Sequence, residues 1–357
     1  MRVLYFGTYE RDYPRNAQVI ASLRGAGVEV VERNVAVWHG RRQNWSLGPA
    51  TALRLAAAQA RLLMRRRPRF DAVVVGYPGQ LDLPAAKWVA RGRPVLFNPL
   101  VSLTETLVED RRRFAAGSPA ARLLNRIDRH ALRAADLVVA DTAASARSLE
   151  LLAQLPPGSV EVSFVGAEER LFAPGWARPA RFEAFFVGKL IPLHGVETIL
   201  AAARLAPELP FTIVGSGQLD ALLASPPPNV TRIDWIDYER LPERLRAAGC
   251  ALGIFGTSPK AQRVIPNKAF QALACGTPLV TADTPGAREL LRHGESALLV
   301  PPGEPESLAE ALRRLAGDAE LARRIGAGGH AAYRAHASEA VLGRRWRELV
   351  EGLLARP

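Results

Sequence analysis

The chain of 357 residues is poor in cysteine, in lysine and in long apolar runs. Its two cysteines, Cys250 and Cys275, are predicted to be buried thiols in a reducing compartment rather than a disulfide framework. No uninterrupted apolar run approaches the roughly 20 residues that a membrane-spanning helix needs. A strand is predicted almost at the first residue, which leaves no room for a signal peptide. These absences favour a cytoplasmic globular protein.

Several catalytic motifs are absent as well. The sequence has no G-x-x-x-x-G-K-[ST] loop, no G-x-G-x-x-G after the first predicted strand and no G-x-S-x-G turn. Its six histidines are scattered and show no metal-ligand spacing. The pattern therefore argues against P-loop, dinucleotide-binding, serine-hydrolase and metal-centred chemistry.

The net charge of +12 is concentrated in the first half of the chain. Residues 1–180 carry 26 lysines and arginines against 16 acidic residues, whereas residues 181–357 carry 21 against 19. Arginine clusters occur at Arg41-Arg42, at Arg65-Arg66-Arg67 and at Arg111-Arg112-Arg113.

Three interpretations of this charge stay open. The basic residues form a solvated face, contact an anionic membrane surface, or bind nucleic acid. Near anionic lipids each basic residue gains about 1 kcal/mol, so a peripheral contact with the inner face of the plasma membrane is the second interpretation. Nucleic acid is not expected as a partner, because interleaved aromatic residues, zinc ligands and a helix-turn-helix pattern are all missing.

Short apolar strands alternate with helical segments along the whole chain, which predicts parallel sheets covered by helices on both faces. The stretch 173–181, which contains two prolines and a glycine, is predicted to link a first domain, 1–172, to a second, 182–337. An amphipathic helix is expected within 338–357. The predicted fold class is α/β, with two Rossmann-like, doubly wound domains facing one another across a ligand-binding cleft.

The most informative stretch runs from Arg263 to Gly303. Pro266 and Asn267 are typical of a helix start, since proline in the first turn loses no intrahelical hydrogen bond. Helical spacing of apolar residues follows, and Gly276 is expected to end the helix. A helix N-terminus with an adjacent lysine, Lys268, is a natural binding place for a phosphate. The sequence therefore predicts a ligand that carries phosphates.

This segment resembles the donor-binding signature of the retaining nucleotide-sugar glycosyltransferases of family 4, which have the two-domain GT-B fold. Their signature has two glutamates separated by seven residues, with a lysine three residues before the second. Lys268 matches the lysine, whereas Arg263 and Gln271 occupy the glutamate positions. The resemblance covers nearly all of the second half and, more loosely, the first half.

The resemblance implies a nucleotide-diphosphate sugar as donor substrate, no cofactor, no metal, and transfer with retention to an acceptor hydroxyl. The acceptor is an unidentified carbohydrate, lipid-linked or small molecule, and the final helix should return toward the N-terminal domain. The loop after the strand at 184–187 should neutralise the diphosphate through Lys189 and His194. The implied donor-binding residues are Gly7, Gly188, Lys189, His194, Gly215, Trp235, Ile236, Asn267, Lys268 and Gln271. Those implied on the acceptor side are Asp12, Arg15, Gln80 and Asp82, expected at strand ends facing the cleft.

Two residues are candidates for a direct part in the reaction. Glu105 is a candidate to interact with an acceptor hydroxyl, and the other interpretation of this residue, which is favoured slightly, is capping of a helix after Thr104. Arg263 cannot stabilise an oxocarbenium ion, but it could clamp the leaving diphosphate or an acidic sugar. Two alternatives to the transferase stay open. One is a catalytically silent GT-B protein that binds a nucleotide sugar or partners an active enzyme, and the other is an epimerase on the same fold.

Overall fold

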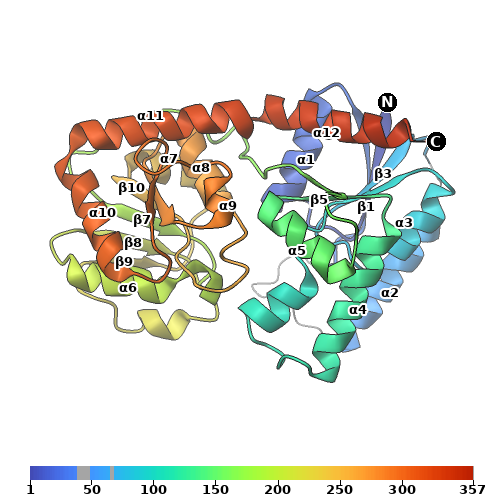
Figure 1. Ribbon diagram of the computed structural model, residues 1–357, viewed down its shortest axis with the longest axis horizontal. Helices are drawn as coiled ribbons and strands as arrows, with labels where there is room; N and C mark the ends of the chain where they lie inside the picture. Colours follow the sequence, from blue (N-terminus) through green and yellow to red (C-terminus); the bar gives the residue numbers. More distant parts are fainter. Residues whose placement is uncertain (38–48, 65–67, 357) are drawn as a thin grey trace. The chain divides into compact units, whose positions relative to one another are not determined.

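The computed structural model describes residues 1–37, 49–64 and 68–356 (Figure 1). The chain forms two compact units. Unit 1 comprises residues 1–108, 113–165 and 339–357, and unit 2 comprises residues 109–112 and 166–338. Each unit contains a six-stranded sheet in which all strand pairs are parallel. The arginines at 41–42 and 65–67 lie outside the described residues.

In unit 1 the strand order is β2-β1-β3-β4-β5-β6. The strands are β1 (Arg2–Gly7), β2 (Glu29–Asn34), β3 (Ala72–Val75), β4 (Val95–Phe97), β5 (Leu137–Ala140) and β6 (Val160–Val162). The helices are α1 (Pro14–Gly25), α2 (Pro49–Met64), α3 (Leu83–Ala90), the π-helix η1 (Glu105–Asp110), α4 (Pro119–Ala134), α5 (Ala143–Ala153) and α12 (Glu339–Leu354). One core cluster joins α1 and α12 to one face of the sheet, and another joins α2, α3, α4 and α5 to the other face.

In unit 2 the strand order is β12-β11-β10-β7-β8-β9. The strands are β7 (Ala184–Val187), β8 (Phe211–Val214), β9 (Val230–Ile233), β10 (Cys250–Leu252), β11 (Leu279–Ala282) and β12 (Leu298–Val300). The α-helices are α6 (Val196–Leu205), α7 (Leu241–Ala247), α8 (Asn267–Cys275), α9 (Pro285–Arg288), α10 (Pro305–Gly317) and α11 (Ala319–His336). Short 3-10 helices are η2 (Pro192–His194), η3 (Asp220–Leu223) and η4 (Tyr238–Arg240).

Local sequence explains where the helices begin and end. Ser118 caps α4 by accepting a hydrogen bond from the Ala121 amide, and Thr142 caps α5 in the same way. Gly276 ends α8 in the left-handed conformation, with a φ of 74°. The strands β3, β5, β8 and β11 are buried along their whole length, as expected for parallel sheets covered on both faces. The α/β, doubly wound fold class is therefore confirmed.

The topology of unit 2 indicates where a ligand would bind. The chain runs outward from β7 to β8 and β9, and the later strands β10, β11 and β12 add to the other side of β7. In doubly wound sheets the crevice at such a reversal, at the carboxyl ends of the strands, is the usual ligand site. The loop after β7 and the segment from β10 to α8 meet there.

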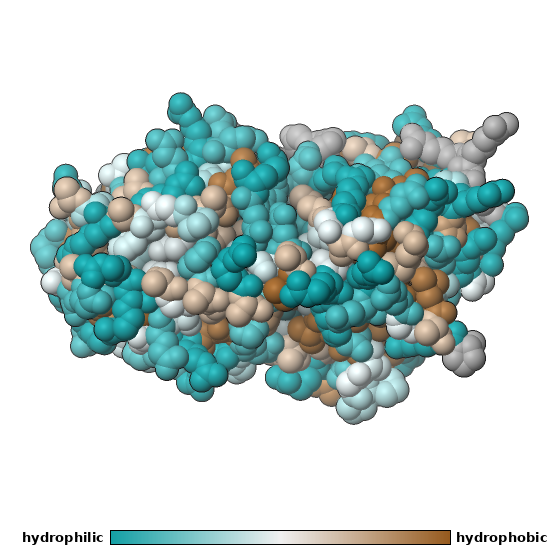
Figure 2. All heavy atoms as spheres, turned by 90° about the horizontal axis from the view of Figure 1, so that it is seen from above, coloured by the Kyte–Doolittle hydropathy of each residue, from teal (hydrophilic) through white to brown (hydrophobic). Residues whose placement is uncertain are grey.

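The face of the molecule drawn in Figure 2 carries mainly polar side chains. Figure 2 shows one face of the molecule, on which hydrophilic residues dominate and hydrophobic ones form small patches between them. Among the described residues, no helix is both long and apolar enough to cross a membrane.

Candidate functional site

The candidate site in unit 2 centres on Gly188, the first residue after β7. Its φ of +154° is disfavoured for residues with a side chain, and a Cβ here would lie 2.7 Å from the Nζ of Lys268 and 3.0 Å from the Cε1 of His194. A Cβ on the neighbouring Gly215, which follows β8, would overlap the Gly188 carbonyl oxygen. Glycine at 188 thus lets a lysine and a histidine from two different segments approach one backbone position.

Lys268 lies in the first turn of α8, and its side chain is only 7% exposed. Its Nζ lies 3.7 Å from the centre of the Phe186 ring and has no hydrogen-bond partner among the described residues. Burial holds the pKa of this lysine well below its ordinary value. A buried amine without a partner, at a helix N-terminus, is suited to pair with an anion.

His194, at the end of η2, is buried beside Lys268. Its Nδ1 lies 2.5 Å from the Lys189 carbonyl oxygen, and because a carbonyl can only accept, Nδ1 must donate. Burial, followed by the charge of Lys268, holds the pKa of His194 well below its ordinary value. The neutral ring therefore presents Nε2 as an acceptor, and it becomes a donor only when protonated.

Two further candidates for donor binding are Lys189, in the loop after β7, and Gln271, on α8. Lys189 is exposed, and its carbonyl orients His194. Gln271 is buried on α8, and its Nε2 donates to the Tyr238 hydroxyl at 3.2 Å. The Tyr238 ring in turn packs edge-to-face on Phe172, with centroids 5.5 Å apart. Tyr238 thus holds Gln271 in place, and Phe172 packs against Tyr238.

The remaining candidates of unit 2 differ in exposure. Asn267 and Ile236 are half-buried, whereas the Trp235 side chain is 75% exposed. Arg263 is half-buried and forms an ion pair with Glu109 at 3.6 Å. Lys260 is buried, and like Lys268 it lowers the pKa of His194. Several cationic groups therefore act on one histidine, and this concentration of positive charge suits a polyanionic ligand.

In unit 1, Asp82 is buried at the N-terminus of α3. Its carboxylate accepts hydrogen bonds from the Thr8 amide at 2.7 Å, the Thr8 hydroxyl at 3.1 Å and the Gln59 amide at 2.5 Å. Burial raises the pKa of Asp82 to about 6. This carboxylate occupies the space that a side chain on Gly7 would need, so the structure explains Gly7 without a donor molecule.

Arg15, expected at a strand end, lies on α1, and its side chain is fully buried. Its Nε donates to Asn98 Oδ1 at 3.0 Å, its Nη1 donates to the carbonyls of Ser163 and Phe164 at 2.7 Å each, and its guanidinium lies over the Trp346 ring. These contacts tie α1 to the segment after β6 and to α12. Among the other acceptor-side candidates, Asp12 is exposed, and buried Gln80 donates to the Val101 carbonyl at 2.8 Å.

Glu105 begins the π-helix η1, and its Oε1 accepts a hydrogen bond from Ser148 of α5 at 2.6 Å. Its own amide donates to Ser102 Oγ, so Ser102 caps this helix and Glu105 does not. The sequence offered no sign of Asp128 and Asp141, two buried aspartates whose pKa burial raises to about 6. Within the described residues, no group of three or more histidine, cysteine and acidic side chains could hold a metal ion.

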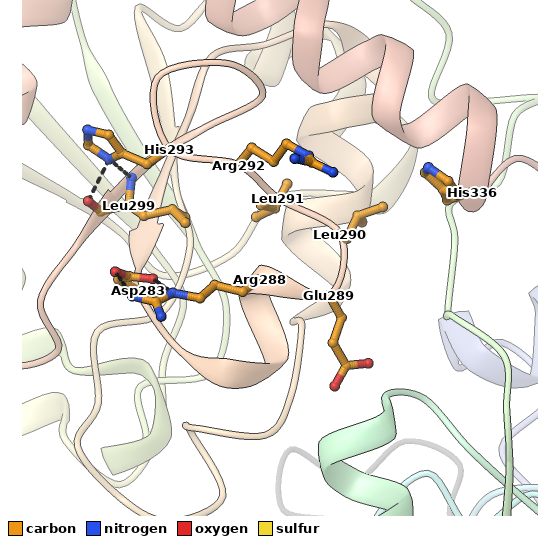
Figure 3. Close-up of a pocket in the computed structure, with 9 residues that line it drawn as sticks. All are labelled: Asp283, Arg288, Glu289, Leu290, Leu291, Arg292, His293, Leu299 and His336. Atoms are coloured by element: carbon orange, nitrogen blue, oxygen red, sulfur yellow. Dashed lines mark hydrogen bonds and ion pairs between the residues drawn. The ribbon is translucent and has the colours of Figure 1, made fainter.

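A pocket of about 610 Å³ also lies in unit 2 (Figure 3). It is lined by Asp283, Arg288, Glu289, Leu290, Leu291, Arg292, His293, Leu299 and His336. Figure 3 shows Asp283 and Arg288 pointing toward one another, and two hydrogen bonds of 2.5 and 2.6 Å join them. The charges of this pair compensate each other, and the other basic residues of the lining, Arg292, His293 and His336, are exposed, unlike the buried amine of Lys268.

The two halves of the chain match two known families. Residues 2–166 match the family described as "Glycosyl transferase 4-like domain", and residues 181–318 match "Glycosyl transferases group 1". A D-inositol 3-phosphate glycosyltransferase of Acidothermus cellulolyticus is 30% identical over 295 residues, which are 72% of this chain and 61% of that relative. The chain thus spans about six tenths of that protein's length.

Solved structures share the fold across the whole chain. Sucrose-phosphate synthase from Thermosynechococcus elongatus has a TM-score of 0.76 at 18% identity, covering 99% of both chains. Anabaena Alr3699/HepE, solved in complex with UDP-glucose, has a TM-score of 0.71 at 18% identity and covers 99% of this chain and 100% of that one. With both domain matches in sequential order and this architecture, the chain belongs to the family 4-like glycosyltransferases of GT-B fold.

Proposed function

We propose that this protein transfers a sugar from a nucleotide-diphosphate donor to an acceptor hydroxyl, with retention of configuration and without a metal ion. The observation that carries the proposal is the Lys268 amine, which is buried and unpartnered beside Gly188 in the domain that matches group 1 glycosyl transferases. The relation to HepE, whose structure holds UDP-glucose, supports a nucleotide sugar as the ligand class.

In this proposal the diphosphate lies against Lys268, the first amides of α8 and the loop that carries Lys189 and His194. Positive charge at this place stabilises the leaving nucleotide diphosphate, where negative charge develops in the transition state. His194, neutral without ligand, takes up a proton when the diphosphate binds and donates from Nε2. These cations would supply the charge neutralisation that a divalent metal otherwise provides.

The positions of Arg263 and Gln271 favour one specific alternative. Neither residue supplies the carboxylate that the resembled signature places there, and Gln271 is already held by Tyr238. The second candidate function is therefore a catalytically silent GT-B protein that binds a nucleotide sugar or partners an active enzyme. In the transferase proposal, Gln271 binds the ribose hydroxyls through its amide, Arg263 clamps the diphosphate, and Glu105 binds the acceptor hydroxyl.

Calorimetry with uridine, guanosine and adenosine diphosphates and their sugars tests the binding step. Lys268→Ala should lower the affinity for the best ligand by about 1–3 kcal/mol, the usual loss for a hydrogen bond to a charged group. Lys87→Ala is the matched control, because Lys87 is an exposed lysine of α3 paired with Asp136. An unchanged affinity in Lys268→Ala would place the diphosphate elsewhere.

Turnover separates the two candidate functions. Release of nucleotide diphosphate from the bound donor, alone and with a panel of sugar and lipid-linked acceptors, should occur at the same rate with and without a metal chelator. Binding without turnover under all acceptors would favour the silent protein. Loss of turnover in the chelator would contradict the metal-independent mechanism while leaving the transferase assignment in place.

A further inference from the structure

The helices on one face of the unit 1 sheet carry an unusual distribution of charge. Helices α2, α3, α4 and α5 lie side by side on this face (Figure 1) and share one core cluster with the sheet. Their cationic residues are Arg54, Arg61, Lys87, Arg122, Arg126, Arg129, Arg133 and Arg147. Their acidic residues are Asp128 and Glu150, and both are buried. We name the outer side of these four helices the α2–α5 surface.

Both carboxylates on these helices accept hydrogen bonds from backbone amides and are not directed to the surface. Asp128 accepts hydrogen bonds from the backbone amides of Leu103 and Thr104, and Glu150 accepts one from the amide of Val160. Of the eight cations, Lys87 pairs with Asp136, just beyond α4, and the other seven make no ion pair within the described residues. The α2–α5 surface therefore presents positive charge that the protein itself does not neutralise.

Helices α12 and α10 do not share this pattern. On the opposite face of the same sheet, α12 carries exposed Glu348 and Glu351 together with arginines, and Arg347 pairs with Glu351 at 2.7 Å. In unit 2, α10 carries exposed Glu310 beside Arg313 and Arg314. The α2–α5 layer thus has a larger excess of positive charge than α10 or α12.

Large apolar side chains are exposed on the same layer. Leu53 and Met64 on α2, Trp88 on α3, Leu123 on α4 and Leu151 on α5 are each between 55% and 81% exposed. On α2 the residues Leu55, Ala58 and Leu62 are buried, so Leu53 and Met64, which are exposed, lie outside the buried face of this helix. Leucine, methionine and tryptophan between basic residues are typical of helices that lie at a lipid interface.

We propose that the α2–α5 surface docks onto an anionic phospholipid bilayer. The basic side chains would pair with lipid phosphates, and the apolar side chains would enter the interfacial region. A phosphate-rich nucleic acid would satisfy the arginines equally, but it would give no reason for exposed leucine and methionine. This docking does not depend on the donor site, which lies in unit 2.

Vesicle sedimentation of the full chain tests this surface. Vesicles that contain phosphatidylglycerol should sediment the protein, pure phosphatidylcholine vesicles should not, and added salt should release it. The variant Arg122→Gln/Leu123→Ser on α4 should bind at least about tenfold more weakly, since each arginine contributes roughly fivefold. The matched control is Arg204→Gln/Leu205→Ser on α6 of unit 2, also an adjacent exposed pair, which should bind as the wild type does.

Three results would contradict docking of the α2–α5 surface onto an anionic bilayer. Equal sedimentation by the two kinds of vesicle, or equal losses in the α4 and α6 variants, would overturn the proposal. Binding to a DNA or RNA duplex in preference to vesicles would overturn it as well. If Arg122→Gln/Leu123→Ser fails to fold, as judged by thermal unfolding, Arg126→Gln/Arg147→Gln tests the same prediction through exposed charges alone. Binding of nucleotide diphosphate should be unchanged in all of these variants, so this test and that of the donor site fail independently.

Discussion

The amine of Lys268 lies over the Phe186 ring, 3.7 Å from its centre, in a cation–π contact. Such a contact stabilises the fold by about 0.5–2 kcal/mol. Burying a polar group without a hydrogen bond costs about 1–3 kcal/mol, and burying a charged group costs more. The ring therefore offsets only part of the cost, in agreement with the lowered pKa of this lysine. Groups held at such a cost are concentrated at functional sites.

This relationship predicts opposite effects of one substitution on stability and on binding. Lys268→Met keeps the aliphatic length and the contact with Phe186 but removes the unpartnered amine. We expect the free energy of unfolding of the unliganded protein to rise by about 1–3 kcal/mol. The same variant should lose the rise in melting temperature that a nucleotide diphosphate gives the wild type. Urea denaturation and thermal unfolding with and without ligand measure both effects, and a destabilised unliganded variant would contradict the prediction.

The stability difference between wild type and Lys268→Met should depend on pH in a defined direction. The folded-state pKa of Lys268 lies below the ordinary lysine value of 10.5, so below that pH the unfolded chain binds a proton that the folded chain does not. Wild-type stability is therefore lost as pH falls from 10.5 toward the lowered pKa, and Lys268→Met lacks this loss. The two denaturation curves should converge as the pH rises toward 10.5.

A side chain at position 188 should damage the same site. In Gly188→Ala the new Cβ would lie 2.7 Å from Lys268 Nζ, and φ would remain in a region that costs a non-glycine residue about 1–3 kcal/mol. We expect lower stability and a loss of nucleotide binding by tenfold or more, since the amine must move. Gly317→Ala is the matched control, because nothing lies within 4 Å of its Cβ and it sits at the end of α10. Wild-type affinity in Gly188→Ala would show that the amine does not define the site.

Much of the fold could be predicted from the sequence because local signals and tertiary packing agree. The helices at 119–134 and 143–153 begin after Ser118 and Thr142, whose side chains cap them, and the strand between them is a short apolar run. Gly188, His194 and Lys268 belong to two motifs that the parallel topology brings to one edge of the sheet. The structure places them together, and their role in donor binding stays a prediction.

The unit 1 candidates show why the rest could not be predicted. Arg15 and Asp82 are polar residues near strand ends in sequence, which favoured solvent and ligand contacts. Both are buried instead, where they hydrogen-bond partners 74 and 148 residues away in the chain, the Thr8 amide for Asp82 and the Ser163 carbonyl for Arg15. The burial of Asp128 and Asp141 could not be predicted for the same reason, since no local sequence pattern indicates that a carboxylate is buried. Hydrogen bonds between residues far apart in the chain determine that these side chains are buried. Such bonds produce no periodic pattern in the sequence.

Protonation of His194 should be measurable as proton uptake when a nucleotide diphosphate binds. The neutral imidazole donates Nδ1–H to the Lys189 carbonyl and can contact a phosphate as a donor only after protonation of Nε2. Binding of a nucleotide diphosphate should raise its pKa, take up protons, and weaken as pH rises, by up to about tenfold per pH unit for one linked proton. Calorimetry in buffers of different ionisation enthalpy measures this uptake. His194→Gln should reduce it and Lys268→Met should remove most of the remainder, whereas His130→Gln on α4 should leave it unchanged.

Ionisation of Asp82, which lies in unit 1, should make the free energy of unfolding depend on pH. Burial raises the pKa of its folded state to about 6, against 3.8 when unfolded, so the folded chain binds the extra proton between these values. Stability from this group is present below about pH 4 and is lost as pH rises through 6, by about 3 kcal/mol at one pKa unit per 1.36 kcal/mol. Asp82→Asn cannot ionise, and the oxygen of the introduced side-chain amide could still accept from the Thr8 amide, so the variant should lack this loss. Thr8→Val should move the loss to higher pH, because the Thr8 hydroxyl lowers the pKa of Asp82. Urea denaturation between about pH 4 and 7 compares the three proteins, and identical profiles in all of them would show that Asp82 ionises without cost.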